Sequence, residues 1–174
     1  MTNAELAILS LVAEKPRHGY QIEQVIKERG MREWTEVGFS SIYYLLKKLE
    51  DQDLIESKLE ETDRGPARKV YRITRSGEVR LREYLLQVLS CPQKCYPAFQ
   101  LGLANLPTLS EEDSLNALRE YRIELSTRLK SLRAGWESQK PLPMNIDAMF
   151  DYSISLIQAE MDWLDRFIYQ LQNV

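Results

Sequence analysis

The stretch Ser40–Glu50 reads SSIYYLLKKLE, and it decides the fold. Its aliphatic residues recur at the i, i+3, i+4 and i+7 spacing of one buried helical face, and Ser40 or Ser41 can cap the N-terminus of the helix. The hydroxyl, phenol and ammonium groups lie mainly on the opposite face, which suits the phosphates and base edges of nucleic acid. Of the two tyrosines, we expect Tyr44 to pack in the core. The aliphatic stripe comprises Ile42, Leu45, Leu46 and Leu49.

Two helices are expected before this one. The first has Thr2 and Glu5 at capping-box spacing and ends before Pro16. The second begins around residues 18–20, and Gly30 is a natural stop for it. In the loop that follows, the side chains expected to lie against the core are Trp34 and Val37.

Beyond Ser40–Glu50 the hydrophobic period changes from 3.6 to 2, which predicts strands. A connection that contains Asp63, Gly65 and Pro66 separates two alternating runs, so residues 55–74 are expected to form a hairpin. A further helix then runs to Pro92. Three helices, a hairpin and a helix in this order predict a winged helix-turn-helix. Its recognition helix, about residues 40–51, would enter a major groove, and the hairpin, here called the wing, would contact the backbone.

Composition supports a folded chain with a local basic region. The 174 residues are 44% hydrophobic and 28% charged, which fits one large or two small domains and excludes disorder. The formal net charge of -3 falls entirely on residues 91–174, because the first 90 residues carry equal numbers of basic and acidic side chains. From Arg64 to Arg82 the side chains are strongly basic, with Glu78 as the only acid. This run indicates an anion-facing patch, and the alternative is an ordinary solvated face.

The second half predicts two long helices. Ser110 can cap the first, residues 140–143 break it, and the last helix runs from about 145 to 172. The last helix carries an apolar seam of period 3.5, as in a coiled coil, and Met149, Leu156 and Trp163 form a second apolar line. Because two helices alone have little core, we expect a dimer, and the alternative is an arm that folds back on its own chain. The seam, predicted as the dimer interface, comprises Phe150, Ile154, Ile157, Met161, Leu164, Ile168 and Leu171.

The fold class predicted is therefore mainly α with a small β-hairpin. Residues 1–90 would form the winged helix-turn-helix DNA-binding domain, and residues 91–174 a helical C-terminal dimerisation domain. No cofactor, metal or enzymatic activity is expected. His18 is the only histidine, and neither a glycine-rich phosphate loop nor a nucleophile–base arrangement is present. Cys91 and Cys95 are expected to be free thiols. A cytoplasmic location is expected, since residues 1–13 do not resemble a signal peptide and no apolar run could span a membrane.

Several motifs, in order and at these spacings, resemble the PadR family of bacterial transcriptional regulators. The second-half pattern is similar to the larger subgroup of that family, which includes virulence-activator-like members. One departure is visible: Asp53 stands where the family usually has a glycine at the end of the recognition helix. The motifs are ILSLV at 8–12, PRHGYQI at 16–22, SSIYYLLKKLE at 40–50, LI at 54–55, GPARKVYRIT at 65–74 and SG at 76–77.

The resemblance implies a homodimer held largely by the C-terminal helices, a palindromic operator in double-stranded DNA, and usually repression. Some relatives respond to aromatic small molecules, and here Trp136, Tyr152 and Trp163, with Phe150, would line such a pocket. The alternative is a winged helix that binds only proteins. Carried over by position, the residues that would contact DNA are Tyr20, Ser40, Ser41, Tyr43, Lys47, Arg64, Arg68 and Lys69.

Overall fold

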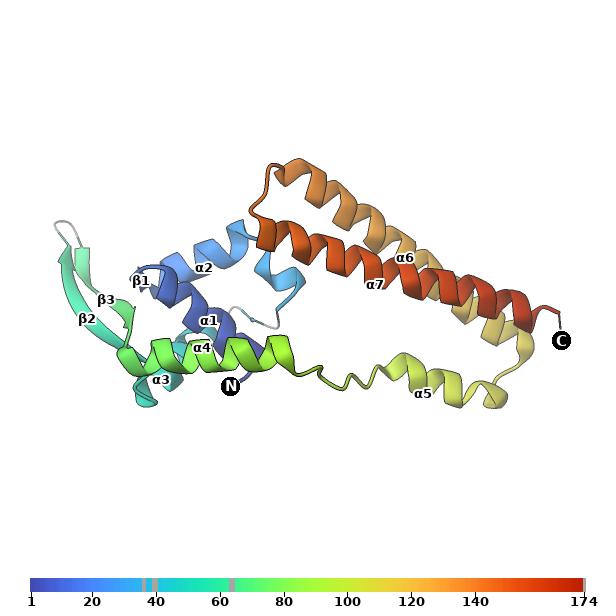
Figure 1. Cartoon of the computed structure of the whole chain (residues 1–174), viewed down its shortest axis with the longest axis horizontal. Coiled ribbons are helices and arrows are strands. Elements are labelled where there is room, and N and C mark those ends of the chain that lie inside the picture. The colour runs from blue at the N-terminus through green and yellow to red at the C-terminus, as the bar shows by residue number, and fades with distance from the viewer. Residues whose placement is uncertain (36, 39–40, 63–64, 174) are drawn as a thin grey trace. The chain divides into compact units, whose positions relative to one another are not determined.

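The computed structural model describes residues 1–35, 37–38, 41–62 and 65–173. The chain divides into two compact units, Met1–Lys94 and Cys95–Val174, which we call the N-terminal and C-terminal units. The N-terminal unit contains α1 (Asn3–Glu14), β1 (Arg17–His18), α2 (Gly19–Glu28), a 3-10 turn (Met31–Glu33), α3 (Ser41–Asp51), β2 (Ile55–Thr62), β3 (Gly65–Ile73) and α4 (Arg75–Ser90) (Figure 1). The C-terminal unit contains α5 (Ala98–Ala104), a 3-10 turn (Leu106–Thr108), α6 (Glu111–Gln139) and α7 (Met144–Leu171).

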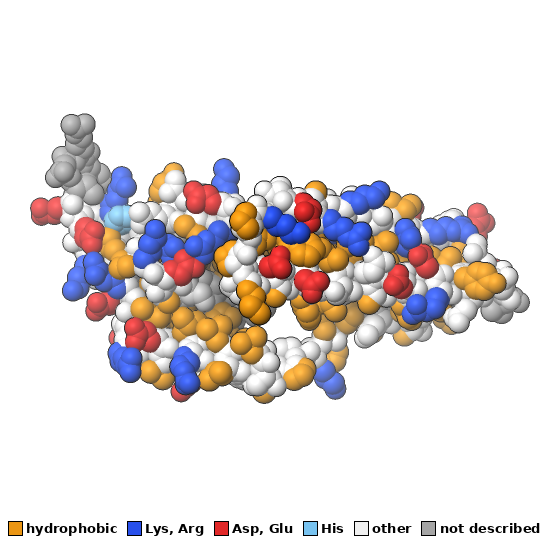
Figure 2. Space-filling view, turned by 45° about the horizontal axis from the view of Figure 1, so that its top comes forward, with side chains coloured by type: hydrophobic (Ala, Val, Ile, Leu, Met, Phe, Trp, Pro, Cys, Tyr) orange, Lys and Arg blue, Asp and Glu red, His pale blue; other side chains and the backbone are white. Residues whose placement is uncertain are grey.

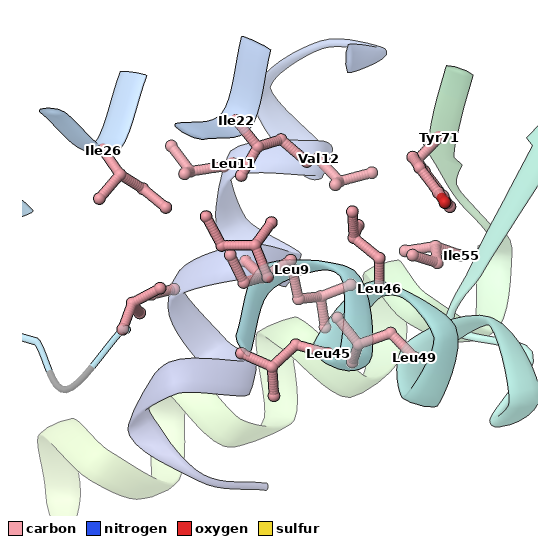
Figure 3. Close-up of a cluster of buried hydrophobic side chains, with 14 of the residues drawn as sticks. Leu9, Leu11, Val12, Ile22, Ile26, Leu45, Leu46, Leu49, Ile55 and Tyr71 are labelled. Carbon is pink, nitrogen blue, oxygen red and sulfur yellow. The ribbon is translucent and has the colours of Figure 1, made fainter. Parts of the chain in front are cut away.

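The core of the N-terminal unit forms around α1, and Figure 3 shows its side chains. The aliphatic stripe predicted for α3 is buried in this core, with Leu46 and Leu49 fully buried. Ile55 from β2 and Tyr71 from β3 close the core on the side of the sheet. Because one face of α3 is fixed against α1 and the sheet, its polar face is turned outward. The predicted winged helix-turn-helix is confirmed.

The sheet has one strand more than predicted. The hairpin of β2 and β3 is present, and β1 pairs antiparallel with β3, so the strand order is β1-β3-β2. A strand of two residues is too short to produce an alternating pattern, which is why the sequence did not indicate it. Arg17 of β1 is buried, and its guanidinium donates hydrogen bonds to the Leu11 carbonyl and, at 2.7 Å, to Glu14. This ties the short strand to α1.

The C-terminus of α3 ends in a Schellman motif. The Leu54 amide donates to the Leu49 carbonyl and the Asp53 amide to the Glu50 carbonyl, both at 3.0 Å. Asp53 has a φ of 56°, the left-handed conformation that favours glycine. The helix therefore ends as it would with glycine, at some cost in free energy for the aspartate.

The start of α4 is fastened to the start of β2. The Thr74 hydroxyl accepts from the Gly77 amide at 3.0 Å and donates to the Asp53 carbonyl at 2.6 Å. Gly77 lies so close to Leu54 that a Cβ added to it would be 2.0 Å from the Leu54 carbonyl oxygen. Since no side chain fits in that space, the approach of α4 to the sheet requires glycine at this position.

In the C-terminal unit, α6 and α7 pack side by side as an antiparallel pair (Figure 1). The seam predicted for the dimer faces α6 of the same chain. Ile157, Met161 and Leu164 are buried there. Phe150, Ile154, Ile168 and Leu171 are half-buried, and the last three pack against the same cluster. Within one chain, α6 thus covers most of the seam, because a hairpin of two helices satisfies its 3.5-residue period, and contact of the half-buried seam residues with a second copy stays a prediction.

Two further expectations about the core are wrong. Tyr44 is 66% exposed and Trp34 is 53% exposed, while Val37 is buried as predicted. The α3 stripe already fills the available space, so Tyr44, which is one position before Leu45, turns outward with Tyr43. None of the helices in the described part of the chain is both long and apolar enough to span a membrane.

Candidate nucleic-acid interface

The outward face of α3 presents aromatic and basic side chains. Tyr43 and Tyr44 are each about two-thirds exposed, and Lys47 is exposed. Lys47 has no ion-pair partner among the residues that the structure describes. At the start of the helix the Ser41 hydroxyl donates to the Gly38 carbonyl at 2.7 Å, which leaves its lone pairs as acceptors. This face can therefore offer a phenol, a hydroxyl and a cation to one ligand.

The neighbouring lysine anchors α3 instead. Lys48 forms an ion pair with Glu5, a buried carboxylate that also completes the α1 capping box with Thr2. Burial opposes ionisation of Glu5, but hydrogen bonds from Lys48 and the Thr2 amide outweigh it, so the pKa of this carboxyl lies below its ordinary value. Two adjacent lysines thus have different roles: Lys48 positions the helix, and Lys47 is left for a ligand.

Helix α2 supports the aromatic part of the face. Tyr20 is 62% exposed, and its hydroxyl accepts from the Gln24 amide at 3.3 Å. A Cβ added to Gly19 would lie 2.7 Å from Cε1 of Tyr43. The glycine at the start of α2 therefore leaves the space in which the Tyr43 ring lies.

The wing carries charges of both signs. Arg68 and Lys69 are exposed on β3 as predicted. Acidic side chains of β2 lie among them, and Arg72 is paired with Glu60 at 3.5 Å. In α4, Arg75 and Arg80 pair with glutamates three residues on. Figure 2 shows blue and red side chains mixed on this part of the surface. The basic run in the sequence is thus partly neutralised, and Arg68 is a wing cation without an ion pair among the described residues.

A carboxylate joins α3 to the wing. Glu50 Oε1 accepts a hydrogen bond from the Ser57 hydroxyl at 2.5 Å, and Glu50 Oε2 lies 3.6 Å from Nζ of Lys69. Burial, followed by the nearby charges of Glu50 and Tyr43, raises the pKa of Tyr71 in the same region. The Lys69 carbonyl lies 3.3 Å from Nδ1 of His18, which caps α2. The angle between α3 and the wing is therefore held by polar contacts as well as by the core.

Six of the predicted contact residues thus belong to the described part of the N-terminal unit, while Ser40 and Arg64 lie outside the described residues. Sequence reasoning gave Glu5 only its capping-box role and gave no role to Gly19 and Glu50. Gly19 and Glu50 stand inside quoted motifs, but their roles depend on neighbours that come together only in the fold. The six residues are Tyr20, Ser41, Tyr43, Lys47, Arg68 and Lys69.

The residues predicted for an aromatic pocket do not form one site within the chain. Trp136 stacks on Phe150 with ring centroids 6.4 Å apart and donates from Nε1 to Asp147 at 2.7 Å. Trp163 belongs to another group of rings, and Tyr152 is 67% exposed. Along α7, Phe150 and Trp163 are about 20 Å apart at 1.5 Å per residue. Within one chain, Trp136 and Trp163 therefore belong to separate groups of rings.

The rings around Trp163 form a continuous cluster in the C-terminal unit. Phe99 of α5 stacks on Tyr121 at 4.4 Å and meets Trp163 edge-on at 6.1 Å, and Trp163 stacks on Phe167 at 5.0 Å. The Tyr121 hydroxyl donates to Glu160 at 2.7 Å. Burial and this hydrogen bond raise the pKa of Tyr121 to about 12. We call these residues the aromatic cluster, and α5 contributes only one ring to it.

The two cysteines, Cys91 and Cys95, are free and exposed. Among the described residues, no group of three or more His, Cys, Asp or Glu side chains is placed to hold a metal ion.

Comparison with known proteins shows which families and proteins this chain is similar to. The family model of the transcriptional regulator PadR-like family matches residues 8–83. A protein of Lysinibacillus sphaericus is 36% identical over 76 residues, which cover 44% of this chain and 69% of that protein. The negative transcriptional regulator PadR of Bacillus subtilis is 26% identical over 131 residues, or 75% of this chain and 71% of that protein.

Solved structures show the same fold over nearly the whole chain. Crystal structures of Bacillus subtilis PadR in complex with operator DNA and with p-coumaric acid have TM-scores of 0.78 and 0.81. Both are 21% identical, and the matches cover 96% and 97% of this chain and 98% of that chain.

Proposed function

Because the chain belongs to the transcriptional regulator PadR-like family, we propose that this regulator acts as a dimeric repressor on a palindromic operator. The observation that carries the proposal is the outward face of α3. Its apolar side is buried and Lys48 is held by Glu5, so Tyr43, Tyr44 and Lys47 are presented to solvent on a rigid helix. Because the backbone that carries these groups is already ordered, binding to DNA costs side-chain entropy but little backbone entropy.

The contacts divide by role. Lys47 on α3 and Arg68 on the wing would neutralise phosphates and supply affinity for any duplex. Ser41 and Tyr43, at the start of α3, would reach base edges and supply sequence preference, as recognition helices do with their first turns. Tyr20 would support α2 at the backbone. In support, Bacillus subtilis PadR, which shares the fold, has been crystallised with operator DNA.

The dimer would use the second apolar line of α7 and the residues beside it. With the seam covered by α6, Met149 and Leu156 remain exposed, and Tyr152 lies between them in the sequence. Ile123 on α6 is also exposed. Exposed aliphatic and aromatic side chains on a pair of long helices favour association with a second copy. The half-buried seam residues would contribute at the edges of that interface.

Binding to DNA is tested with the purified full chain and a fluorescent duplex from the region flanking its gene. We expect saturable anisotropy with two subunits per duplex. Since several phosphates are neutralised, the logarithm of the affinity should fall steeply and linearly with the logarithm of salt concentration. A folded protein that binds no duplex at any salt concentration would instead indicate a winged helix that binds only proteins.

We further propose that a planar aromatic molecule weakens the binding of the regulator to DNA and that this molecule binds at the aromatic cluster. Bacillus subtilis PadR has been crystallised with p-coumaric acid. In this chain Phe99 already fills the position between Tyr121 and Trp163 that a planar ring would take. Leu103 is the other α5 side chain packed against this core. An aromatic ligand would therefore displace a short helix that is held by two side chains.

Tryptophan fluorescence tests the effector. Titration with p-coumaric acid should quench Trp163, and the signal should be lost in Trp163→Phe but kept in Trp136→Phe. Phe99→Ala should tighten the binding of the ligand, because the competing ring is gone. If no phenolic acid changes the fluorescence or the affinity for DNA, the proposed effector is wrong while DNA binding is unaffected.

A further inference from the structure

Among the carboxylates of the surface that we propose to face DNA, Glu50 of α3 is the one that pairs with Lys69. Glu50 ends the outward row of α3, and its side chain is 30% exposed. A negative charge at this place repels phosphates and should weaken binding. Yet the structure holds it firmly, with Oε1 accepting from the Ser57 hydroxyl at 2.5 Å and Oε2 lying 3.6 Å from Nζ of Lys69.

The contact makes the two neighbouring cations of the wing unequal. Lys69 is 54% exposed, and its ammonium group is paired with Glu50. Arg68 is exposed and has no ion-pair partner in the described part of the chain. Successive residues of a strand point to opposite faces, and directly opposite residues of paired strands share a face. Lys69 therefore lies on the face of Ser57 and Tyr71, toward α3, and Arg68 lies on the other face. Lys69 is therefore the cation that a carboxylate on α3 can reach.

We propose that Glu50 competes with DNA phosphate for Lys69 and so keeps the ammonium group from making a full phosphate contact when the regulator binds. This inference rests on the proposed binding of DNA by α3 and the wing. Glu50 then lowers affinity for duplex DNA of every sequence by the same factor, because the group it occupies contacts the backbone. Sequence preference, which depends on Ser41 and Tyr43, is left unchanged. The Ser57 hydrogen bond keeps the carboxylate in place for this role.

The expected gain in affinity for DNA follows from counterion release. Each additional phosphate that the protein neutralises adds about 0.9 to the slope of log affinity against log salt, which is about fivefold at about 0.15 M salt. In Glu50→Gln the charge is removed, while the amide oxygen can still accept from Ser57. Affinity should therefore rise by up to about fivefold per subunit, and the salt slope should steepen.

The experiment measures binding of the full chain to a gene-flanking duplex and to a random duplex. We compare wild type, Glu50→Gln, Lys69→Ala and the double variant, with Glu124→Gln on α6 as the matched charge control. We expect Glu50→Gln to bind both duplexes more tightly by the same factor and with a steeper salt slope, and the steepening to be absent when Lys69 is alanine. Unchanged or weaker binding by Glu50→Gln would overturn the inference, as would a steepening that persists without Lys69.

A second comparison decides the matter if Glu50→Gln folds poorly. Because Lys69 is already paired and Arg68 is not, Arg68→Ala should weaken DNA binding more than Lys69→Ala. Equal losses, or a larger loss for Lys69→Ala, would contradict the inference. Wild-type protein that binds neither duplex would overturn the proposed function itself, whereas an indifferent Glu50→Gln in a regulator that binds DNA overturns only the role of Glu50.

Discussion

Gly77→Ala destabilises the N-terminal unit by about 3 kcal/mol, the upper range for overpacking a close contact. The added Cβ would lie 2.0 Å from the Leu54 carbonyl oxygen and 2.7 Å from a side-chain carbon of Ile73. Backbone cannot move aside as a flexible side chain does, so α4 must shift and the Thr74 cap must break. For a unit of this size, thermal unfolding should begin about 15 °C lower.

Gly102→Ala is the matched control. Gly102 is also helical, but apart from its own helix backbone and chain neighbours, no atom of the described residues lies within 4 Å of the position of its Cβ. Alanine favours helix over glycine by about 1 kcal/mol, so this variant should be neutral or slightly more stable. Circular dichroism on heating compares the two. Equal melting temperatures for both variants would show that α4 does not approach Leu54 as closely as the structure places it.

Lys47→Ala has the second large effect, on DNA binding. Losing one phosphate contact in each subunit of a dimer should cost about fivefold twice, or about 25-fold at about 0.15 M salt, and lower the salt slope by about 1.8. Operator and random duplex should weaken alike. Since the side chain is exposed and unpaired among the described residues, the melting temperature should not change.

Lys130→Ala, an exposed lysine on α6, controls for overall charge and should bind as wild type. Ser41→Ala and Tyr43→Phe should instead reduce the difference in affinity between the operator and a random duplex. If the double variant Tyr43→Ala, Lys47→Ala keeps wild-type affinity for the operator, then the outward face of α3 is not the DNA-binding surface.

The sequence predicted the helices and strands correctly where the local hydrophobic pattern matches the burial of the side chains. The stripe in α3, the Ser110 cap and the change of period at the hairpin each predicted the observed element. Tyr44 was misplaced because the number of side chains that a core can hold is a property of the packed structure. The two-residue strand β1 was missed since its partner lies far along the chain.

The sequence predicted which groups of the candidate site are exposed, but it did not predict the contacts that hold them in place. Spacing indicated that Tyr43 and Lys47 share an outward face, but not that Gly19 makes room for the Tyr43 ring or that Lys48 is held by Glu5. In the C-terminal half, the period of the seam was right, and α6 of the same chain covers most of it. A 3.5-residue repeat indicates that another helix covers the seam, but it does not indicate which chain supplies that helix.

Footprinting on the DNA that flanks the gene tests the central claim most directly. Two copies of α3 in successive major grooves should protect a two-fold symmetric site whose half-sites are about 34 Å apart. The protection should disappear with the Tyr43→Ala, Lys47→Ala variant at the same protein concentration. The same symmetric footprint from that variant, or no protection by folded wild-type protein, would contradict the account.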